Sequence, residues 1–325
     1  MKKRAAVAGI LAAMAAMILD SRWASQSALS ALELCLKTLI PNLFPLFVLS
    51  SLLIPKLTGL RIPFLAKLLG IPDGSEGIFL LGCAGGFPVG AVCIAQAVEA
   101  KGLTKPDAER MLGLCSFCGP SFLFGVIGAV LSLPDALLIF AIQLETALLT
   151  AACWPTPSSD TYTPSSKTID LPTAVRRSVT SMATVCAWVI LAGVAAGFLD
   201  RWLFPLLLGP LGVLATGLLE LTNGIFSLDA ITSPDLRFLL STVFVCFGGV
   251  SVLLQIAGLA APAGLSMKPC IAQKLTQSLL GGLLAYLSIR LGPVSLLLPP
   301  AILFAKIAVE IPGAMVYNSR RKEGI

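Results

Sequence analysis

Two glycine-rich interruptions inside hydrophobic stretches are the features of this sequence that could bind a solute. The first is the run 85–90, GGFPVG, at the centre of stretch 78–100, and the second is Gly248-Gly249, at the centre of stretch 238–261. Proline lacks a backbone donor and glycine permits a sharp reversal, so both break helices. The freed backbone groups are tolerated in lipid only beside protein or a water-filled cavity. The runs predict main-chain groups that bind a polar solute or ion, and the alternative is kinked helices packed closely at glycine.

Polar uncharged side chains follow these interruptions and extend the candidate site. Each could hydrogen-bond a solute, or equally satisfy a backbone carbonyl across a helix contact. The candidate substrate-binding or pore-lining residues are Gly85, Gly86, Pro88, Gly90, Gln96, Ser116, Gly119, Pro120, Ser121, Gly248, Gly249, Ser251 and Gln255.

Five charged residues fall inside hydrophobic stretches. Glu33 and Lys37 are four residues apart, as are Lys306 and Glu310, so each pair can meet on one helix face. Glu145 has no local partner. Charges in a membrane span are costly and by default indicate a functional site. The alternative is a neutralised pair near the interface, with the lysine reaching water.

The residue types of common enzymes and metal sites are missing or incomplete. The sequence has no histidine, which removes the commonest general base and metal ligand. Cys115 and Cys118 form a C-x-x-C, but no second pair completes a zinc site, and most of the nine cysteines lie in apolar runs as small hydrophobes. There is no nucleophile elbow or Walker loop. We therefore expect no enzyme activity, no metal and no cofactor.

The composition predicts the elements that must position these residues. Of the 325 residues, 56% are hydrophobic and 12% charged, against about 25% charged in soluble domains. This predicts an all-α polytopic membrane protein. Stretches of about 20 apolar residues can span a bilayer. Candidate spans are 5–22, 28–54, 110–131, 135–153, 178–200, 271–290 and 294–316, with a Gly/Pro-rich stretch, 202–220, along the interface.

The two halves of the chain carry similar motifs in the same order. Cys83-x-Gly-Gly is followed by GLTKP from Gly102, and Cys246-x-Gly-Gly by GLSMKP from Gly264, at nearly the same distance. If each broken segment is a re-entrant hairpin, each half crosses the membrane three times. We therefore predict two inverted repeats, each with a broken hairpin and about three spanning helices, plus an N-terminal helix.

The domain boundaries follow from this repeat and from composition. We expect an N-terminal helix over 1–24, or alternatively a signal-like segment, and a basic tail over 318–325. The repeats cover 25–153 and 178–317, joined by a flexible Pro/Ser/Thr-rich loop, 154–177. With the N-terminus inside, the positive-inside rule gives thirteen basic residues inside and eight outside, counting Lys274 among the outer ones.

The motifs of both halves resemble those of the YlbJ family of sporulation integral membrane proteins. The likeness covers LKTLIPNLFPLFVLSSLLI (36–54), GGFPVGA (85–91), GLTKPDAERMLGLCSFCGPSFLFG (102–125), FVCFGGVSVLLQ (244–255) and GLSMKP (264–269). These proteins are grouped with the nucleoside recognition or Gate domain proteins. The positions carried over from the family motif are Gly86, Pro88, Gly90, Glu109, Arg110, Gly119, Pro120, Gly248 and Gly249.

The resemblance implies a role in spore formation, in the cell (inner) membrane of a spore-forming bacterium. The Gate likeness implies a transporter-like protein that moves or gates a small polar solute. The alternative is a non-transporting scaffold for spore coat or cortex assembly. The partners expected are membrane lipid and a small polar solute, with a second copy of the chain or other sporulation membrane proteins left open. No nucleic acid is expected, because the basic residues lie between apolar segments.

Overall fold

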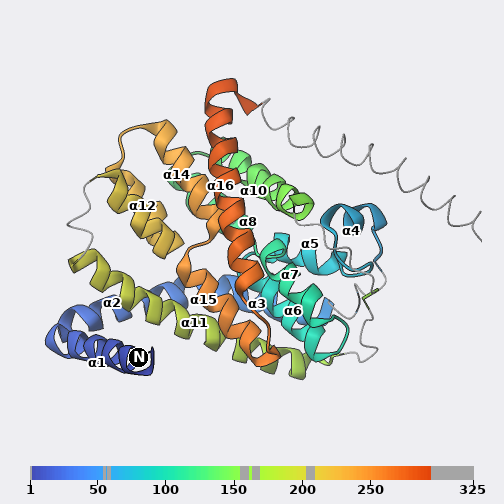
Figure 1. Ribbon diagram of the computed structural model, residues 1–325, viewed down its shortest axis with the longest axis horizontal. Helices are drawn as coiled ribbons and strands as arrows, with labels where there is room; N and C mark the ends of the chain where they lie inside the picture. Colours follow the sequence, from blue (N-terminus) through green and yellow to red (C-terminus); the bar gives the residue numbers. More distant parts are fainter. Residues whose placement is uncertain are drawn as a thin grey trace, which may run out of the picture.

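The computed structural model describes residues 2–53, 56, 60–153, 161–162, 169–202 and 209–293, and every regular element in them is helical (Figure 1). The first half contains α1 Lys2–Leu19, α2 Ser21–Leu34, π-helix η1 Cys35–Leu39, α3 Ile40–Leu53, α4 Pro63–Leu69, α5 Glu76–Gly85, α6 Val89–Glu99, α7 Lys105–Leu114, α8 Pro120–Phe122, π-helix η2 Leu123–Ile127, α9 Gly128–Val130 and α10 Leu133–Cys153. The second half contains α11 Leu171–Trp202, α12 Pro210–Leu219, α13 Leu221–Ser227, 3-10 helix η4 Leu228–Ala230, α14 Pro234–Phe247, α15 Val250–Ala260, 3-10 helix η5 Ala261–Ala263 and α16 Lys268–Leu291.

Several helices are long and apolar enough to cross a membrane. Among the described residues these are Leu133–Cys153, Leu171–Leu199 and Pro234–Ala263, and a bent pair, Val7–Leu19 and Ser21–Lys37, joins at 95°. Because so much of their surface is apolar, a bilayer is the solvent that accommodates them. The prediction of an all-α polytopic membrane protein is confirmed.

One predicted span is not a continuous helix. Stretch 110–131 is interrupted between Leu114 and Pro120, where the chain leaves α7 and re-enters a helix at α8. Pro120 disfavours helical backbone in the preceding residue, and Gly119 is indeed extended, with ψ of 156°. The prediction of a span over 110–131 is therefore wrong. The predicted span 294–316 lies outside the described residues.

The two glycine-rich segments are both broken at the predicted residues, but they fold differently. In the first segment, α5 and α6 pack against each other after the turn at Gly86–Pro88, as a hairpin requires. In the second, α14 and α15 follow one another end to end across Gly248-Gly249, and the stretch Pro234–Ala263 is long enough to cross the membrane (Figure 1). The second interruption therefore lies within one continuing stretch and does not form the re-entrant hairpin predicted there.

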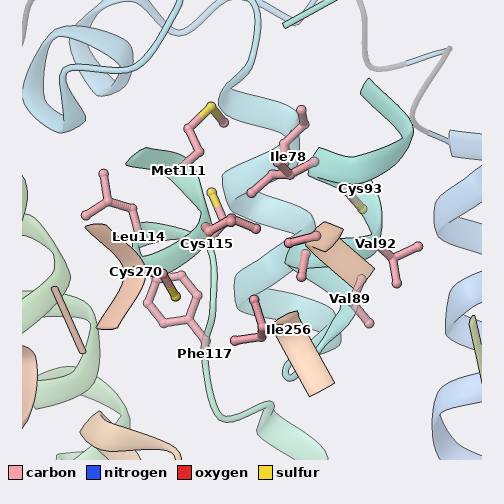
Figure 2. Packing of buried hydrophobic residues seen from close by; sticks show 14 of the residues in the cluster. Ile78, Val89, Val92, Cys93, Met111, Leu114, Cys115, Phe117, Ile256 and Cys270 are labelled. Atoms are coloured by element: carbon pink, nitrogen blue, oxygen red, sulfur yellow. The ribbon is translucent and has the colours of Figure 1, made fainter. Parts of the chain in front are cut away.

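Helix α16 occupies the centre of the bundle and contacts α7, α10 and α14 (Figure 1). Figure 2 shows the apolar core beside it, to which Cys270 of α16, Met111 of α7, Ile78 of α5 and Ile256 of α15 contribute. This core fixes the ends of the broken helices against one another.

Counterparts in the predicted repeat contact each other in pairs. Helix α6 contacts α15, α7 contacts α16, and α3 contacts α11. Helix α7 also meets the matched loop of the second half, because the Glu109 Oε1 atom accepts a hydrogen bond from the Ser266 N–H at 2.8 Å. Such pairing is expected if two similar halves pack face to face. The inverted orientation and the domain division stay predictions.

Helix α11 is held against α2 through small residues. Gly193 and Gly197 form a G-x-x-x-G on α11; a Cβ on Gly193 would lie 2.7 Å from that of Ala31, and Gly197 contacts Ser27. The Trp23 Nε1 atom donates to the Gly197 carbonyl at 2.9 Å. Small residues at this spacing let helix backbones approach closely in a membrane.

The predicted loop 154–177 is partly ordered by neighbouring elements. Helix α11 begins at Leu171, inside that range, and the buried Tyr162 donates its N–H to the Asp73 carbonyl at 3.0 Å. Residues 154–160 and 163–168 of the predicted loop lie outside the described residues.

Candidate functional site

The site is built where four interruptions in the helices come together. They are the turn at Gly86–Pro88, the extended stretch Cys115–Gly119, the break at Glu220 between α12 and α13, and the pair Gly248-Gly249. The interior is thus supplied with main-chain groups from four parts of the chain.

Close contacts join these interruptions one to the next. Gly86 has φ of 73° and lies against Gly119, so that a Cβ on Gly86 would be 2.5 Å from the Gly119 Cα atom. The Phe87 ring covers Gly248, whose notional Cβ would be 2.9 Å from Cζ of Phe87. Gly249 in turn faces the break at Glu220. Gly86, Gly248 and Gly249 have positive φ, which favours glycine, and atoms of a neighbouring segment lie where a side chain would be.

A cavity of about 150 Å³ opens beside this meeting point. Gly85, Gly86 and Phe87 line it from the first interruption, and Cys118 and Gly119 from the second. Leucines of α2, η1 and α3, with Val189 of α11, form much of the apolar wall. Its polar side chains are Ser121, Glu220, Thr222 and Gln255. A few polar groups in an apolar cavity are typical of a small-molecule site.

Gln143 of α10 holds the extended stretch from one side. Its Oε1 atom accepts the Cys118 N–H at 2.8 Å, and its Nε2 atom donates to the Cys118 carbonyl at 3.1 Å. The side chain is buried, with 1% exposed. Both main-chain groups of Cys118 would otherwise be orphaned in an apolar interior, which is costly.

Lys274 and Gln277 of α16 hold the stretch from the other side. The Lys274 Nζ atom donates to the Ser116 carbonyl at 3.0 Å and to Gln277 Oε1 at 2.8 Å. The Gln277 Nε2 atom donates to the Gly113 carbonyl at 3.2 Å. Lys274 is fully buried and its Nζ atom lies 5.3 Å from the centroid of the Phe87 ring. The polar face of α16 thus replaces the helical hydrogen bonds that the stretch lacks.

The structure brings five of the thirteen predicted site residues into the cavity wall. They are Gly85, Gly86, Gly119, Ser121 and Gln255. Pro88, Gly90, Pro120, Gly248 and Gly249 shape the interruptions behind the wall, and Gly90 packs on the Cys115 carbonyl.

The remaining three predicted polar residues do not line this cavity. Ser116 donates to the Leu112 carbonyl of its own preceding helix at 2.5 Å. Gln96 donates to Ser51 Oγ at 3.1 Å and borders a second cavity of about 540 Å³ between α6, α11 and α15. The Ser251 Oγ atom is buried without a hydrogen-bond partner among the described residues.

Of the predicted intramembrane charges, the three that the structure describes do not line the cavity. Glu33 and Lys37 form an ion pair of 3.0 Å with both side chains exposed, which matches the neutralised-pair alternative. Glu145 is partly buried on α10, and its Oε2 atom has no hydrogen-bond partner among the described residues. Lys306 and Glu310 lie outside the described residues.

The assignment of Lys274 to the outer side of the membrane is wrong, because it lies in the centre of the molecule. Sequence reasoning also missed Gln143, Gln277 and Glu220. A signal existed for α16, since its buried Gln273, Lys274, Gln277 and Ser278 recur at helical spacing on one face. No such pattern marks Glu220.

The cysteines of the predicted C-x-x-C lie within the same interior. Cys115 and Cys118 are free and buried, and both lie in the stretch Cys115–Gly119. Among the described residues, no group of three His, Cys, Asp or Glu side chains is placed to hold a metal ion.

Fold and site together define a polytopic helical membrane protein whose helix interruptions meet around an internal cavity. A portion of 103 residues is 27% identical to the sporulation integral membrane protein YlbJ of Bacillus subtilis (strain 168), and covers 30% of this chain. The match spans 25% of the length of that relative, which supports a distant relationship. No protein-family model matches the chain, and no solved structure matches it.

Proposed function

We propose that this protein moves or gates a small polar solute through the cavity between its broken helices. The observation that carries the proposal is that three helix interruptions line one cavity, with the fourth, Gly248-Gly249, behind its wall and with Ser121, Glu220 and Gln255 in that wall. Broken helices at membrane depth are the usual means by which transporters present main-chain groups to a solute. A protein that acts only as a membrane anchor does not need such a site.

The size of the cavity limits the solute. At about 150 Å³, it matches the volume of an engineered protein cavity that accepts benzene. A hydrated ion or a molecule of similar size fits this volume. A nucleoside, the cargo that the Gate likeness suggests, requires the cavity to enlarge.

The distant relative suggests the setting in which the protein acts. Because that relative is named as a sporulation integral membrane protein, we place this chain in the inner membrane of a spore-forming bacterium during sporulation. A Gate-type transporter fold agrees with the two matched halves. The protein is proposed to act without enzyme activity or a cofactor.

Cysteine accessibility tests the proposal. Ser121→Cys and Gln255→Cys are introduced separately into a variant in which the less buried cysteines, Cys83, Cys153 and Cys186, and the cavity-lining Cys118 are replaced by alanine. The protein is placed in vesicles and treated with a charged, membrane-impermeant methanethiosulfonate. If water reaches the cavity, both new thiols react from at least one side, and modification blocks uptake in a solute screen.

The matched control is Leu191→Cys on α11, a span residue with 59% of its surface exposed on the bundle exterior. A thiol in lipid is not reached by a charged reagent, so this position should stay unmodified. If the folded protein shows no modification of either cavity position from either side, the proposed path does not exist.

The second candidate function is a non-transporting scaffold of spore assembly. Its support is the name of the distant relative alone. It predicts that a sporulation defect caused by deleting the protein is fully rescued by a variant whose cavity is filled, such as Ser121→Trp. A transporter variant filled in this way fails to rescue, provided that it reaches the membrane in normal amount.

A further inference from the structure

The strongest unexplained feature of the interior is the ammonium group of Lys274. None of its side chain is exposed, and its two hydrogen-bond acceptors are the Ser116 carbonyl and the amide oxygen of Gln277. Among the described residues, no Asp or Glu forms an ion pair with it. An unpaired buried charge is costly, so native proteins retain one only where something compensates for it.

The compensation comes from main-chain dipoles. Helix α7 ends at Leu114, and the Ser116 carbonyl lies just beyond that end. The last carbonyls of a helix lack partners and carry partial negative charge, which favours a cation at this position. The ring face of Phe87, 5.3 Å from Nζ, adds a further attraction for positive charge. Carbonyl oxygen, amide oxygen and aromatic face together are the ligands of a cation site.

We propose that the interrupted stretch Cys115–Gly119 contains a site for an ammonium-type cation, and that the Lys274 side chain fills it as a tethered ligand. The bound charge holds the stretch in its extended form. Because Cys118 and Gly119 also belong to the cavity wall, the occupied site sets the shape of the cavity. The site itself does not depend on whether the cavity carries a solute.

Chemical rescue tests this assignment. Lys274→Ala removes three carbons and the ammonium group, which are the atoms of n-propylammonium. In the full-length purified variant we expect the melting temperature to fall by roughly 5–10 °C, and the Cys118 thiol, 1% exposed in the native protein, to react at least about tenfold faster with a maleimide. Adding n-propylammonium should restore both values towards those of the native protein.

The neutral analogue n-propanol separates charge from volume. It fills the same space without a cation, so it should restore neither value in Lys274→Ala. The native protein should respond to neither compound, because its site is already filled. Cys35, fully buried on η1 and in contact with the Cys186 carbonyl of α11, should stay protected throughout. Equal rescue by propanol would show that Lys274 only fills space, and no rescue by either compound would also overturn the proposal.

A second variant keeps the test decisive if Lys274→Ala does not fold. Lys274→Met preserves the length and most of the volume of the side chain and removes the charge. We expect it to fold with Cys118 reactive. If Lys274→Met protects Cys118 as well as the native protein does, no cation site is present.

Discussion

Gly86 shows how a single residue determines whether the interruptions can meet. Its φ of 73° and ψ of −169° lie in a region that is essentially restricted to glycine, and the Gly119 backbone occupies the space of a side chain. Sequence reasoning could identify this residue because a Gly-Gly-x-Pro run inside an apolar stretch has few other uses. It could not identify the partner, because contact with Gly119 depends on the packing of distant elements.

We expect Gly86→Ala to lower the free energy of unfolding by about 2–4 kcal/mol, from backbone strain and from displacement of Gly119. Thermal or denaturant unfolding in detergent measures the change. Gly125→Ala is the matched control, since nothing lies within 4 Å of its notional Cβ. That control should be neutral or slightly more stable, by up to about 1 kcal/mol. An equal effect at both positions would contradict the close contact between Gly86 and Gly119.

Gln143 is a residue that sequence reasoning passed over, because one glutamine in an apolar helix carries no pattern. Gln143→Leu keeps most of the volume and leaves the Cys118 N–H and carbonyl without partners. We expect a loss of about 2–4 kcal/mol, since each orphaned buried group costs about 1–3 kcal/mol. Unfolding measurements give the loss, and Gln143→Glu, which keeps an acceptor for the N–H, should recover part of it. A Leu variant as stable as the native protein would show that water or another group replaces the side chain.

Among the helices, long apolar elements were predictable and short broken ones were not. Hydropathy alone identified α10 and α11, and glycine and proline identified the two central breaks. The break at Glu220 was missed because it contains neither residue type and depends on α14 packing beside it. Helix α16 was predicted as a span. Its polar face was not predicted, because Lys274 was counted among the basic residues outside the membrane. Its role is visible only once α7 lies beside it.

The contact between α2 and α11 yields a prediction at the level of helices. Gly193→Ile places a branched side chain where Ala31 of α2 lies and should push the helices apart, at a cost of about 1–3 kcal/mol. The Cys35 thiol, fully buried in this contact, should become reactive towards maleimide. Gly9→Ile on α1, with nothing within 4 Å of the notional Cβ, is the control. Continued protection of Cys35 in Gly193→Ile would argue against close packing of these helices.

For the whole molecule, the hydrogen bond between Glu109 and the Ser266 N–H joins α7 of the first half to the matched loop of the second half. Glu109→Ala should lower the free energy of unfolding by about 1–2 kcal/mol, whereas Glu109→Gln retains an acceptor oxygen and should stay close to the native protein. Differential unfolding of the two variants measures this difference. If both lose the same amount, the carboxylate acts through its charge and not through this contact.

The length of α11 has a mechanical consequence. Its 32 residues extend about 48 Å at 1.5 Å per residue, well beyond a hydrocarbon layer of about 30 Å. If the hydrocarbon layer begins at Ser178, as the predicted span does, Ser178 to Leu199 extends about 33 Å and the first turns, with Arg176 and Arg177, project into the headgroup layer. Val189 of the same rigid rod borders the cavity. A thinner or thicker bilayer that changes the tilt of α11 therefore displaces the cavity wall. The length of the lipid chains then affects the shape of the cavity.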